Sequence, residues 1–456
     1  MRAAPPPCPL FPWRRPLLAT GLLLALAAAG SCRTRPELPP PLLMIGIDGL
    51  ERSVVDELSR AGKLEALPRI AAKGVSGLLE VPKPTLSPII WTTIATGVEA
   101  ERHGIEGFTY RDERGRVRLY GSRDRRVKAL WNILGEAGIR TWTIGWWATF
   151  PAERVRGVMV AQVNTRLARR RRQGAIRKGG PAAAAGAVYP PELAPAVAKA
   201  VRTAEQDTAR LIERLIPQPR EEWRETERTL VEQSRWAIRA DLSYFRIALE
   251  LLSRRPPPAL LAVYFGGADV IGHRFWRYAY PDQYEDRPSH RELAAFGDVL
   301  PGYYVELDRM IGRLIEAFPK PANIVILSDH GMRPTRRRRR FDRPMLSGAH
   351  LSAPPAYFAA SGPLIARGAP SRSPRPEVLG SVVDVTPTIL ALLGRPPAAD
   401  MAGRVLRGVL APGLSVHDPV PSYTPAGWTP PAPEIVRSAE ATSERLDQLR
   451  SLGYIQ

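Results

Sequence analysis

The feature that most constrains the fold of this chain is a series of short apolar segments that end in polar residues or glycine. Four are clear, at residues 41–47, 140–147, 259–265 and 323–327. Runs of this length predict buried strands of a parallel sheet. Helical patterns such as residues 54–61 and 303–318 lie between them. The alternation predicts an α/β fold with a central, mostly parallel sheet flanked by helices, and such sheets bind ligands at the carboxyl ends of their strands.

Length and composition predict how this sheet is embedded in the chain. At 456 residues the chain is long enough for one large α/β domain with insertions, which we place at residues 41–411. Residues from about 164 to 254 contain a basic loop, an Ala-rich stretch and two long helical patterns, so a helical insertion is expected there. Residues 412–456 are Pro-rich and close with a short helix in which Leu446, Leu449 and Leu452 share a face.

The net charge of +20 comes mostly from arginine. The arginine runs at residues 169–172 and 336–340 lack the interleaved aromatic side chains that stack nucleic-acid bases, so no nucleic-acid partner is expected. Solvated loop charge explains both runs, and contact with anions at the mouth of a site is the alternative for the second. The chain has two cysteines, Cys8 and Cys32, so no disulfide framework and no cysteine metal site is expected in the domain.

The N-terminal residues 1–32 have the order of an export signal. A basic pair precedes the apolar residues 17–29, and two small residues precede Cys32. This order resembles the cleavage box of bacterial lipoproteins. It implies a lipid on Cys32, an exported protein anchored in the bacterial cell envelope, facing the periplasm or the surface, and a Pro-rich tether at residues 33–40. A plain signal peptide or an uncleaved anchor is the alternative.

Two residues at predicted element boundaries could take part in chemistry. Asp48 directly follows the first strand, so its carboxylate would project into the crevice at the edge of the sheet. Ser87 suits the N-cap of a helix, and Pro88 suits its first position. A serine there lies beside free backbone N–H groups and the positive end of the helix dipole, which favour an alkoxide and bind phosphate. Taken singly, a turn at Asp48 and a cap at Ser87 explain both residues without any function.

Acidic residues and histidines recur together after the later strands. Asp269 and His273 are four residues apart, which places both on one face of the predicted helix. Asp329 and His330 are adjacent at the end of another strand, and His350 closes the segment that follows. The chain has only six histidines, and three of them fall in these contexts. Carboxylate and imidazole ligands without cysteine predict zinc, with manganese or another divalent ion as the alternative.

In their order along the chain, these residues resemble the ligand set of the alkaline phosphatase superfamily. The resemblance is greatest to the type I phosphodiesterase and nucleotide pyrophosphatase branch and to related bacterial lipoproteins. It runs from about residue 42 to residue 406 and includes residues 384–394. It implies the sandwich fold of that superfamily and a hydrolase of phosphoric esters with two zinc ions. The substrate would be a phosphorylated small molecule or a phospholipid-like ester.

The resemblance also implies a role for each residue. One ion would be held by Asp269, His273 and His350. The other would be held by Asp48, Asp329, His330 and the oxygen of Ser87. Ser87 would be the nucleophile that forms a phosphoserine, which water then hydrolyses. Three carboxylates and a serine alkoxide carry four negative charges, which two divalent ions balance, so an anionic substrate meets no net repulsion.

Two departures from the family pattern concern the substrate. Nucleotide pyrophosphatases usually have threonine as nucleophile and asparagine three residues later, where this chain has Ser87 and Ile90. Ile90 cannot donate a hydrogen bond to a phosphoryl oxygen, so another donor is expected, an arginine or a backbone amide. Sulfatases have Pro after the nucleophile and Arg two residues later. Here Ile89, Ile90 and Trp91 follow Pro88, so sulfatase activity is not expected.

The remaining histidines and a group of aromatic residues leave alternatives open. His103 is expected to be structural, and His290 and His417 lack neighbours that resemble ligands. Four aromatic residues after His273 either wall the substrate pocket or pack beneath the helical insertion: Phe275, Trp276, Tyr278 and Tyr280. The alternative function is a catalytically silent envelope protein that binds anionic glycan or lipid, or a phosphonate or phosphoglycerol-type hydrolase or transferase of the same superfamily.

Overall fold

The computed structural model describes most of the chain from Pro39 onward. The described residues are 39–162, 186–218, 223–335, 346–350, 354–368, 376–435 and 439–451. The predicted signal peptide, Cys32 and residues 33–38 of the predicted tether lie outside this part, as do both arginine runs. Within the described ranges, no helix is both long and apolar enough to cross a membrane.

A nine-stranded sheet forms the centre of the fold. Its strand order is β13-β2-β12-β9-β1-β8-β5-β6-β7. The bounds are β1 Leu42–Ile47, β2 Val75–Glu80, β5 Thr141–Ile144, β6 Gly157–Val160, β7 Val188–Tyr189, β8 Leu260–Phe265, β9 Asn323–Leu327, β12 Ala356–Ser361 and β13 Val378–Ser381. The four strands predicted from apolar runs are β1, β5, β8 and β9, which are parallel neighbours in the middle of the sheet. Among the nine strands only β7 and β12 run antiparallel to their neighbours, so the predicted α/β class with a mostly parallel sheet is confirmed.

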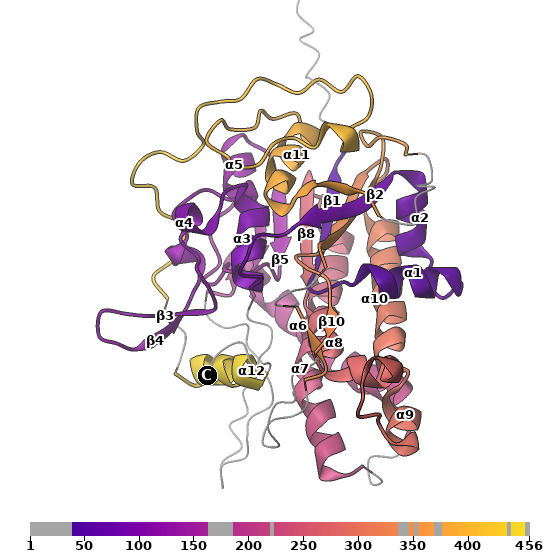
Figure 1. The fold of residues 1–456 in the computed structure, drawn as a ribbon. Helices are drawn as coiled ribbons and strands as arrows, with labels where there is room; N and C mark the ends of the chain where they lie inside the picture. The colour runs from indigo at the N-terminus through magenta and orange to yellow at the C-terminus, as the bar shows by residue number, and fades with distance from the viewer. Residues whose placement is uncertain are drawn as a thin grey trace, which may run out of the picture. The chain divides into compact units, whose positions relative to one another are not determined.

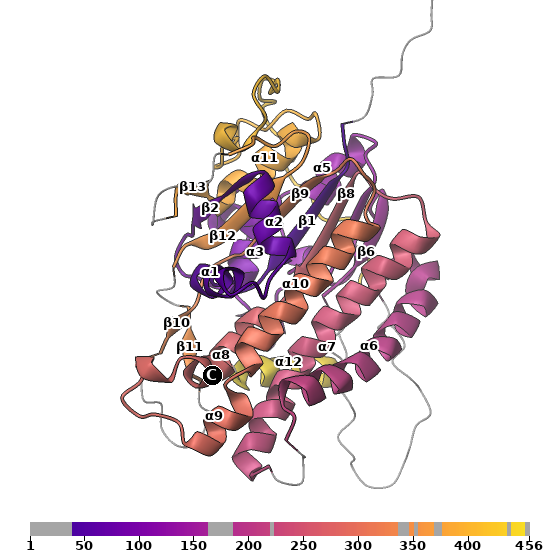
Figure 2. The ribbon, with the colours of Figure 1, turned by 90° about the vertical axis from the view of Figure 1, so that its right-hand side faces the viewer.

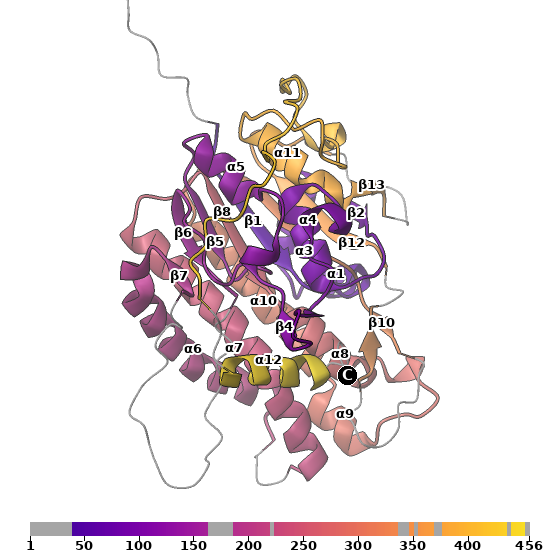
Figure 3. The same ribbon diagram turned by 90° about the vertical axis from the view of Figure 1, so that its left-hand side faces the viewer.

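Helices cover both faces of this sheet. On one face lie α3 (Ser87–Thr96) and α5 (Leu130–Glu136), as Figures 1 and 3 show. On the other face lie α1 (Arg52–Arg60), α2 (Ala66–Lys73), α7 (Glu225–Arg254) and α10 (Val299–Ala317). The patterns at residues 54–61 and 303–318 thus correspond to α1 and α10, and each helix starts a few residues earlier than predicted.

The two long helices that occur in the region of the predicted insertion belong to this second face. Helix α7 packs directly on β8, α8 (Gly267–Ala279) and α10. Helix α6 (Ala194–Leu215) lies along α7, on the side away from α10 (Figure 2). Helix α7 therefore contributes to the core beneath the sheet and also reaches the region beyond the carboxyl ends of the strands.

The strand β5 is shorter than its apolar run predicts. It ends at Ile144, because Gly145 adopts a φ of +77°, which stops the extended conformation. A Cβ atom at this position would lie 2.6 Å from a ring carbon of Tyr244, so the close approach also requires glycine. Trp146 and Trp147 consequently leave the strand, and Trp147 becomes part of a pocket described below.

The C-terminal helix α12 (Ala439–Ser451) lies beside α7 and α8 in Figures 1 and 3. Leu449 of this helix is buried and Leu446 is half-buried, while Leu452 falls outside the described residues. The buried leucine faces the domain and not solvent. The end of the chain thus packs on the α/β domain.

Candidate metal centre and its pocket

The candidate residues lie where the central strands end. Asp48 follows β1, Asp329 and His330 follow β9, and Asp269 lies in the first turn of α8, just after β8. Because β8, β1 and β9 are parallel neighbours in register, these three chain segments leave the sheet at the same edge. His350 reaches this edge from the end of β11 (Gly348–Ala349).

Two groups of buried side chains at this edge have the size of metal sites. The ligand atoms of Asp48, Asp329 and His330 lie within 4.8 Å of one another, and so do those of Asp269, His330 and His350. The Nε2 atom of His330 is 3.4 Å from Oδ1 of Asp48 and 3.3 Å from Oδ2 of Asp329. The rings of His330 and His350 are stacked with their centroids 4.0 Å apart. His330 therefore lies between the two groups.

His273 lies beside the second group. Its Nε2 atom is 3.3 Å from Oδ1 of Asp269, one helical turn before it in α8, and its ring centroid is 5.0 Å from that of His350. The i, i+4 spacing thus brings Asp269 and His273 together, as predicted. Although burial opposes it, the carboxylate of Asp269 raises the pKa of His273 above its usual value.

The hydrogen bonds of two histidines fix which ring nitrogen can bind a metal. His273 Nδ1 lies 2.8 Å from the carbonyl oxygen of Gly348, and His330 Nδ1 lies 3.0 Å from that of Gly331. A carbonyl oxygen only accepts, so each Nδ1 must donate, and in the neutral ring Nε2 keeps its lone pair. In both residues that lone pair is on the nitrogen nearest the carboxylates, the arrangement usual for histidine ligands.

The charge of this cluster fits divalent cations. Asp48, Asp269 and Asp329 are all at most 3% exposed. Burial, together with the neighbouring carboxylates, raises the pKa of Asp48 and of Asp329 above the usual range. Among the described residues, no group hydrogen-bonds to the buried atoms Asp329 Oδ2 and His330 Nε2. Bound cations would neutralise the carboxylates and would be coordinated by these two atoms. The donor set therefore fits the implied metal.

The carboxylate of Asp48 is held in place by groups that the sequence did not single out. Its Oδ2 atom accepts hydrogen bonds from the Tyr264 hydroxyl at 2.6 Å and from Trp91 Nε1 at 3.2 Å. The Tyr264 oxygen in turn accepts from Trp147 Nε1 at 2.9 Å. Tyr264 is the one polar side chain in the apolar strand β8, which was the signal available in the sequence. These contacts orient Asp48 for a ligand on its other oxygen.

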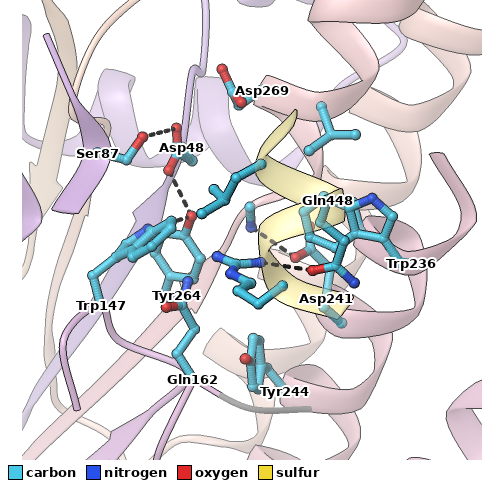
Figure 4. Close-up of a pocket in the computed structure, with 16 residues that line it drawn as sticks. Asp48, Ser87, Trp147, Gln162, Trp236, Asp241, Tyr244, Tyr264, Asp269 and Gln448 are labelled. Atoms are coloured by element: carbon cyan, nitrogen blue, oxygen red, sulfur yellow. Dashed lines mark hydrogen bonds between the residues drawn. The ribbon is translucent and has the colours of Figure 1, made fainter. Parts of the chain in front are cut away.

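Ser87 is the first residue of α3. The prediction that it is the N-cap is wrong by one residue. The N-cap is Leu86, whose extended backbone places its carbonyl to accept from the amides of Ile89 and Ile90. The Ser87 hydroxyl instead donates to Oδ1 of Asp48 at 3.4 Å (Figure 4). The hydroxyl therefore does not cap its own helix and points at the carboxylate cluster instead.

A pocket of about 500 Å³, part of it open to solvent, adjoins this cluster. Asp48, Ser87 and Asp269 lie at one end (Figure 4). Its aromatic wall consists of four residues from β8, α7 and the segment after β5: Trp147, Trp236, Tyr244 and Tyr264. Its remaining polar groups include Gln162, Asp241, Arg445 and Gln448. The two last residues come from α12, so the C-terminal helix takes part in this site.

The aromatic residues that follow His273 are absent from the lining of this pocket. Phe275 and Tyr278 pack against Phe296, and Trp276 packs against Tyr280. The structure thus supports packing and not the pocket wall, and the ring contacts are made with Phe296 and Tyr280, which lie outside the predicted insertion. The pocket wall comes from segments far apart in the sequence.

The surroundings of His103 and Ile90 indicate structural roles for these two residues. His103 is fully buried, accepts a hydrogen bond from the Ile105 amide at Nδ1 and lies 3.2 Å from Thr93 Oγ1 through Nε2. Burial lowers the pKa of His103 to about 3, so it is a neutral link between α3 and the next segment. Ile90 is fully buried in the hydrophobic core and does not line the pocket.

Comparisons with solved structures find matches of low sequence identity. A phosphonoacetate hydrolase from Sinorhizobium meliloti 1021 is 18% identical with a TM-score of 0.41; the match covers 66% of this chain and 58% of the hydrolase. A sulfatase candidate from Bacteroides thetaiotaomicron VPI-5482 is 15% identical (TM-score 0.48), and a 2-O GAG sulfatase is 14% identical (TM-score 0.46). Each of these matches covers 84% of this chain and 79% of the other. No curated protein matches the chain.

A family model gives a more specific result. The model described as type I phosphodiesterase / nucleotide pyrophosphatase matches residues 42–355. This region is more than half of the chain, and it contains every candidate ligand from Asp48 to His350 as well as Ser87. The buried clusters of aspartate and histidine that could hold metal ions lie within the matched region. The chain therefore belongs to the type I phosphodiesterase / nucleotide pyrophosphatase family.

Proposed function

We propose that this protein hydrolyses phosphoric esters. The reaction uses two divalent metal ions, for which zinc is the first candidate, and Ser87 is the nucleophile. One observation carries the proposal. The Ser87 hydroxyl lies 3.4 Å from Asp48, which is itself part of a buried aspartate and histidine cluster large enough for metal ions. Membership of a phosphodiesterase and pyrophosphatase family supports a phosphoester as the substrate.

The structure suggests how the ligands would be divided. Asp48, Asp329 and His330, with the oxygen of Ser87, would hold one ion. Asp269, His273 and His350 would hold the other, and His330 lies near enough to both groups to contact either ion. Bound divalent ions supply Lewis acidity, which stabilises negative charge on nearby oxygens.

The reaction would proceed in two steps, transfer of the phosphoryl group to Ser87 and hydrolysis of the phosphoserine. Asp48 orients the Ser87 hydroxyl through the hydrogen bond to Oδ1. The Ser87 oxygen attacks phosphorus and gives up its proton, a bond from oxygen to phosphorus forms, the bond from phosphorus to the leaving oxygen breaks, and the leaving oxygen takes up a proton. Water then hydrolyses the phosphoserine and restores the hydroxyl. In the first turn of α3, Pro88 has no N–H and the amides of Ile89 and Ile90 already donate to the Leu86 carbonyl, so a donor to the phosphoryl oxygens would come from elsewhere in the pocket.

The first test is metal content and turnover of the purified chain. Zinc is measured by mass spectrometry of the metal, and hydrolysis is measured on aryl phosphate monoesters and diesters. We expect two zinc ions per chain and turnover of at least one ester class, and the ratio of the two rates identifies the preferred class. A chain that binds no divalent metal and hydrolyses neither class contradicts the proposal.

We also propose that the protein is exported and anchored to the bacterial envelope by a lipid on Cys32. The order of a basic pair, an apolar run and small residues before the cysteine supports this. Mass spectrometry of the mature N-terminus, with Cys32→Ser as the comparison, tests it. A mature chain that starts at Cys32 and carries acyl groups is expected, and an unmodified N-terminus upstream of Cys32 contradicts the anchor.

A further inference from the structure

A buried glutamate joins the two chain segments that leave β1 and β9. Glu51 is 5% exposed and lies three residues after Asp48. Its Oε2 atom accepts a hydrogen bond at 2.8 Å from the amide of Met332, which lies three residues after Asp329. Closer to the candidate ligands, the Gly49 amide donates to Oδ1 of Asp329 at 3.1 Å. Glu51 thus forms the outer of two links between the segments that carry Asp48 and Asp329.

The other contacts of Glu51 hold its carboxylate in one place. Oε1 accepts from the amide of Ser53 at 3.0 Å and from its hydroxyl at 2.9 Å, so Glu51 is also the N-cap of α1. The Glu51 amide donates to the Tyr304 hydroxyl at 3.0 Å, which ties the residue to α10. A Cβ atom at Gly331 would lie 2.4 Å from Oε2, so this close approach requires glycine. Oε2 is therefore the oxygen directed at the segment after His330.

The amide that Glu51 binds belongs to a residue between two candidate ligands. Met332 comes two residues after His330 and directly before β10 (Arg333–Pro334). Strand β10 pairs with β11, and His350 follows the last residue of β11. The position of Met332 therefore affects His330 on one side and, through the paired strands, His350 on the other.

The side chain of Met332 reaches the segment of a third histidine. A Cβ atom at Gly272 would lie 3.1 Å from its Cε atom, and one at Gly348 would lie 3.1 Å from its Sδ atom, so the side chain packs on both glycines. Gly272 directly precedes His273 in α8, and the Gly348 carbonyl lies 2.8 Å from Nδ1 of His273. By fixing one amide, Glu51 thus supports the surroundings of ligands from both groups.

This arrangement gives Glu51 a role beyond the start of α1. We propose that Glu51 is a positioning residue of the metal centre, whose carboxylate holds the segment from His330 to β10 where the ligands of both ions meet. The inference rests on the proposed function, because it takes the aspartate and histidine cluster as the metal centre. Loss of a partner that orients ligands typically weakens metal binding by about ten- to a hundredfold. A residue that only capped α1 would leave the metal affinity unchanged.

The zinc affinity of Glu51 variants tests the inference. Glu51→Ala removes both carboxylate oxygens, so the affinity for zinc, measured by competition with a chromogenic chelator, should fall by about tenfold or more. Glu51→Gln keeps the shape of the side chain and one oxygen that can accept from Met332, but its NH2 group cannot accept from Ser53. Its zinc affinity should lie between those of Glu51→Ala and the unmodified chain.

Two controls separate positioning from helix capping and from a general loss of stability. Ser53→Ala removes the hydroxyl that donates to Oε1 and leaves the contact with Met332 in place. Asp308→Asn changes another buried carboxylate, 3% exposed, which accepts from three amides at the start of α2. Both variants should bind zinc within about twofold of the unmodified chain, although Asp308→Asn should lower the urea midpoint of unfolding as Glu51→Ala does.

Two results overturn the inference. One is a zinc affinity of Glu51→Ala, or of Glu51→Gln if the alanine variant does not fold, equal to that of the unmodified chain. The other is an equal loss of zinc affinity in Asp308→Asn and the Glu51 variant, which would mean that any weakening of the fold releases the metal. Failure of the proposed function has a different signature, because the unmodified chain itself would then bind no zinc.

Discussion

The hydroxyl oxygen of Ser87 lies 3.4 Å from Oδ1 of Asp48, although 39 residues separate them in the chain. If Ser87 is the nucleophile, Ser87→Ala should lower turnover by at least about a thousandfold, because the group that accepts the phosphoryl is gone. The zinc content should stay the same, since the aspartates and histidines remain. Steady-state hydrolysis and metal analysis of the same sample measure both quantities.

A buried serine away from the pocket is the control for this variant. Ser122 is fully buried and donates to the Pro151 carbonyl. Ser122→Ala removes a buried hydroxyl of the same kind, so it should cost stability but keep turnover per folded molecule within about twofold. A Ser87→Ala protein with a near-normal rate would show that another group attacks phosphorus.

Replacing Asp269 should separate the two metal ions. Asp269 belongs to one ligand group and Asp48 to the other, so Asp269→Asn should reduce bound zinc from two ions per chain to one. Equilibrium dialysis followed by metal analysis measures the stoichiometry. Asp56→Asn is the control, because this residue is 41% exposed in an ion pair with Arg52. Two ions retained by Asp269→Asn would contradict the assignment.

The hydrogen bond from Tyr264 to Asp48 should tune metal affinity. Tyr264→Phe removes the 2.6 Å hydrogen bond that orients the carboxylate and leaves the ring in place. Loss of such a partner typically weakens metal binding by about ten- to a hundredfold. Competition with a chromogenic chelator measures this change. Tyr423→Phe, which loses a hydrogen bond to the Pro396 carbonyl, should bind zinc as the unmodified chain does.

The central strands could be predicted because their residues are buried on both faces. β1, β8 and β9 are continuous apolar runs, and the polar residues that end them are the ones the sheet brings together. β2 and β12 were missed. β2 contains Ser76, Gly77 and Glu80, and β12 contains Ala and Ser, so neither has the run of branched side chains that marks a buried strand.

The pocket was harder to predict than the ligand cluster. Trp147 lies beyond the end of its strand, and Arg445 lies in a tail that the sequence marked only as Pro-rich with a short helix. The apolar stripe of that helix predicts that one face of the helix is buried, but it does not predict which part of the domain covers that face. Contacts between such distant segments follow from tertiary packing, which a single sequence does not encode locally.

Asp241 should make the stability of the protein depend on pH. It is fully buried and accepts hydrogen bonds from the amides of Gly266 and Gly267 and from the Tyr303 hydroxyl. Burial outweighs these donors and raises the pKa of Asp241 from 3.8 to about 7. Because the folded protein holds this proton more tightly than the unfolded chain, the stabilisation is full below the unfolded pKa of 3.8 and is lost as pH rises through about 7.

The loss between about pH 5 and about pH 8 should be on the order of 2 to 3 kcal/mol of unfolding free energy. Urea unfolding of the metal-free chain at both pH values measures it, since metal binding has a pH dependence of its own. Asp241→Asn has no carboxyl to titrate, so its unfolding free energy should fall less over the same pH range. The unfolding free energy of Asp56→Asn, in which Asp241 is unchanged, should fall as much as that of the unmodified chain. Parallel pH profiles for the unmodified chain and Asp241→Asn would mean that the three hydrogen bonds keep Asp241 ionised in spite of its burial.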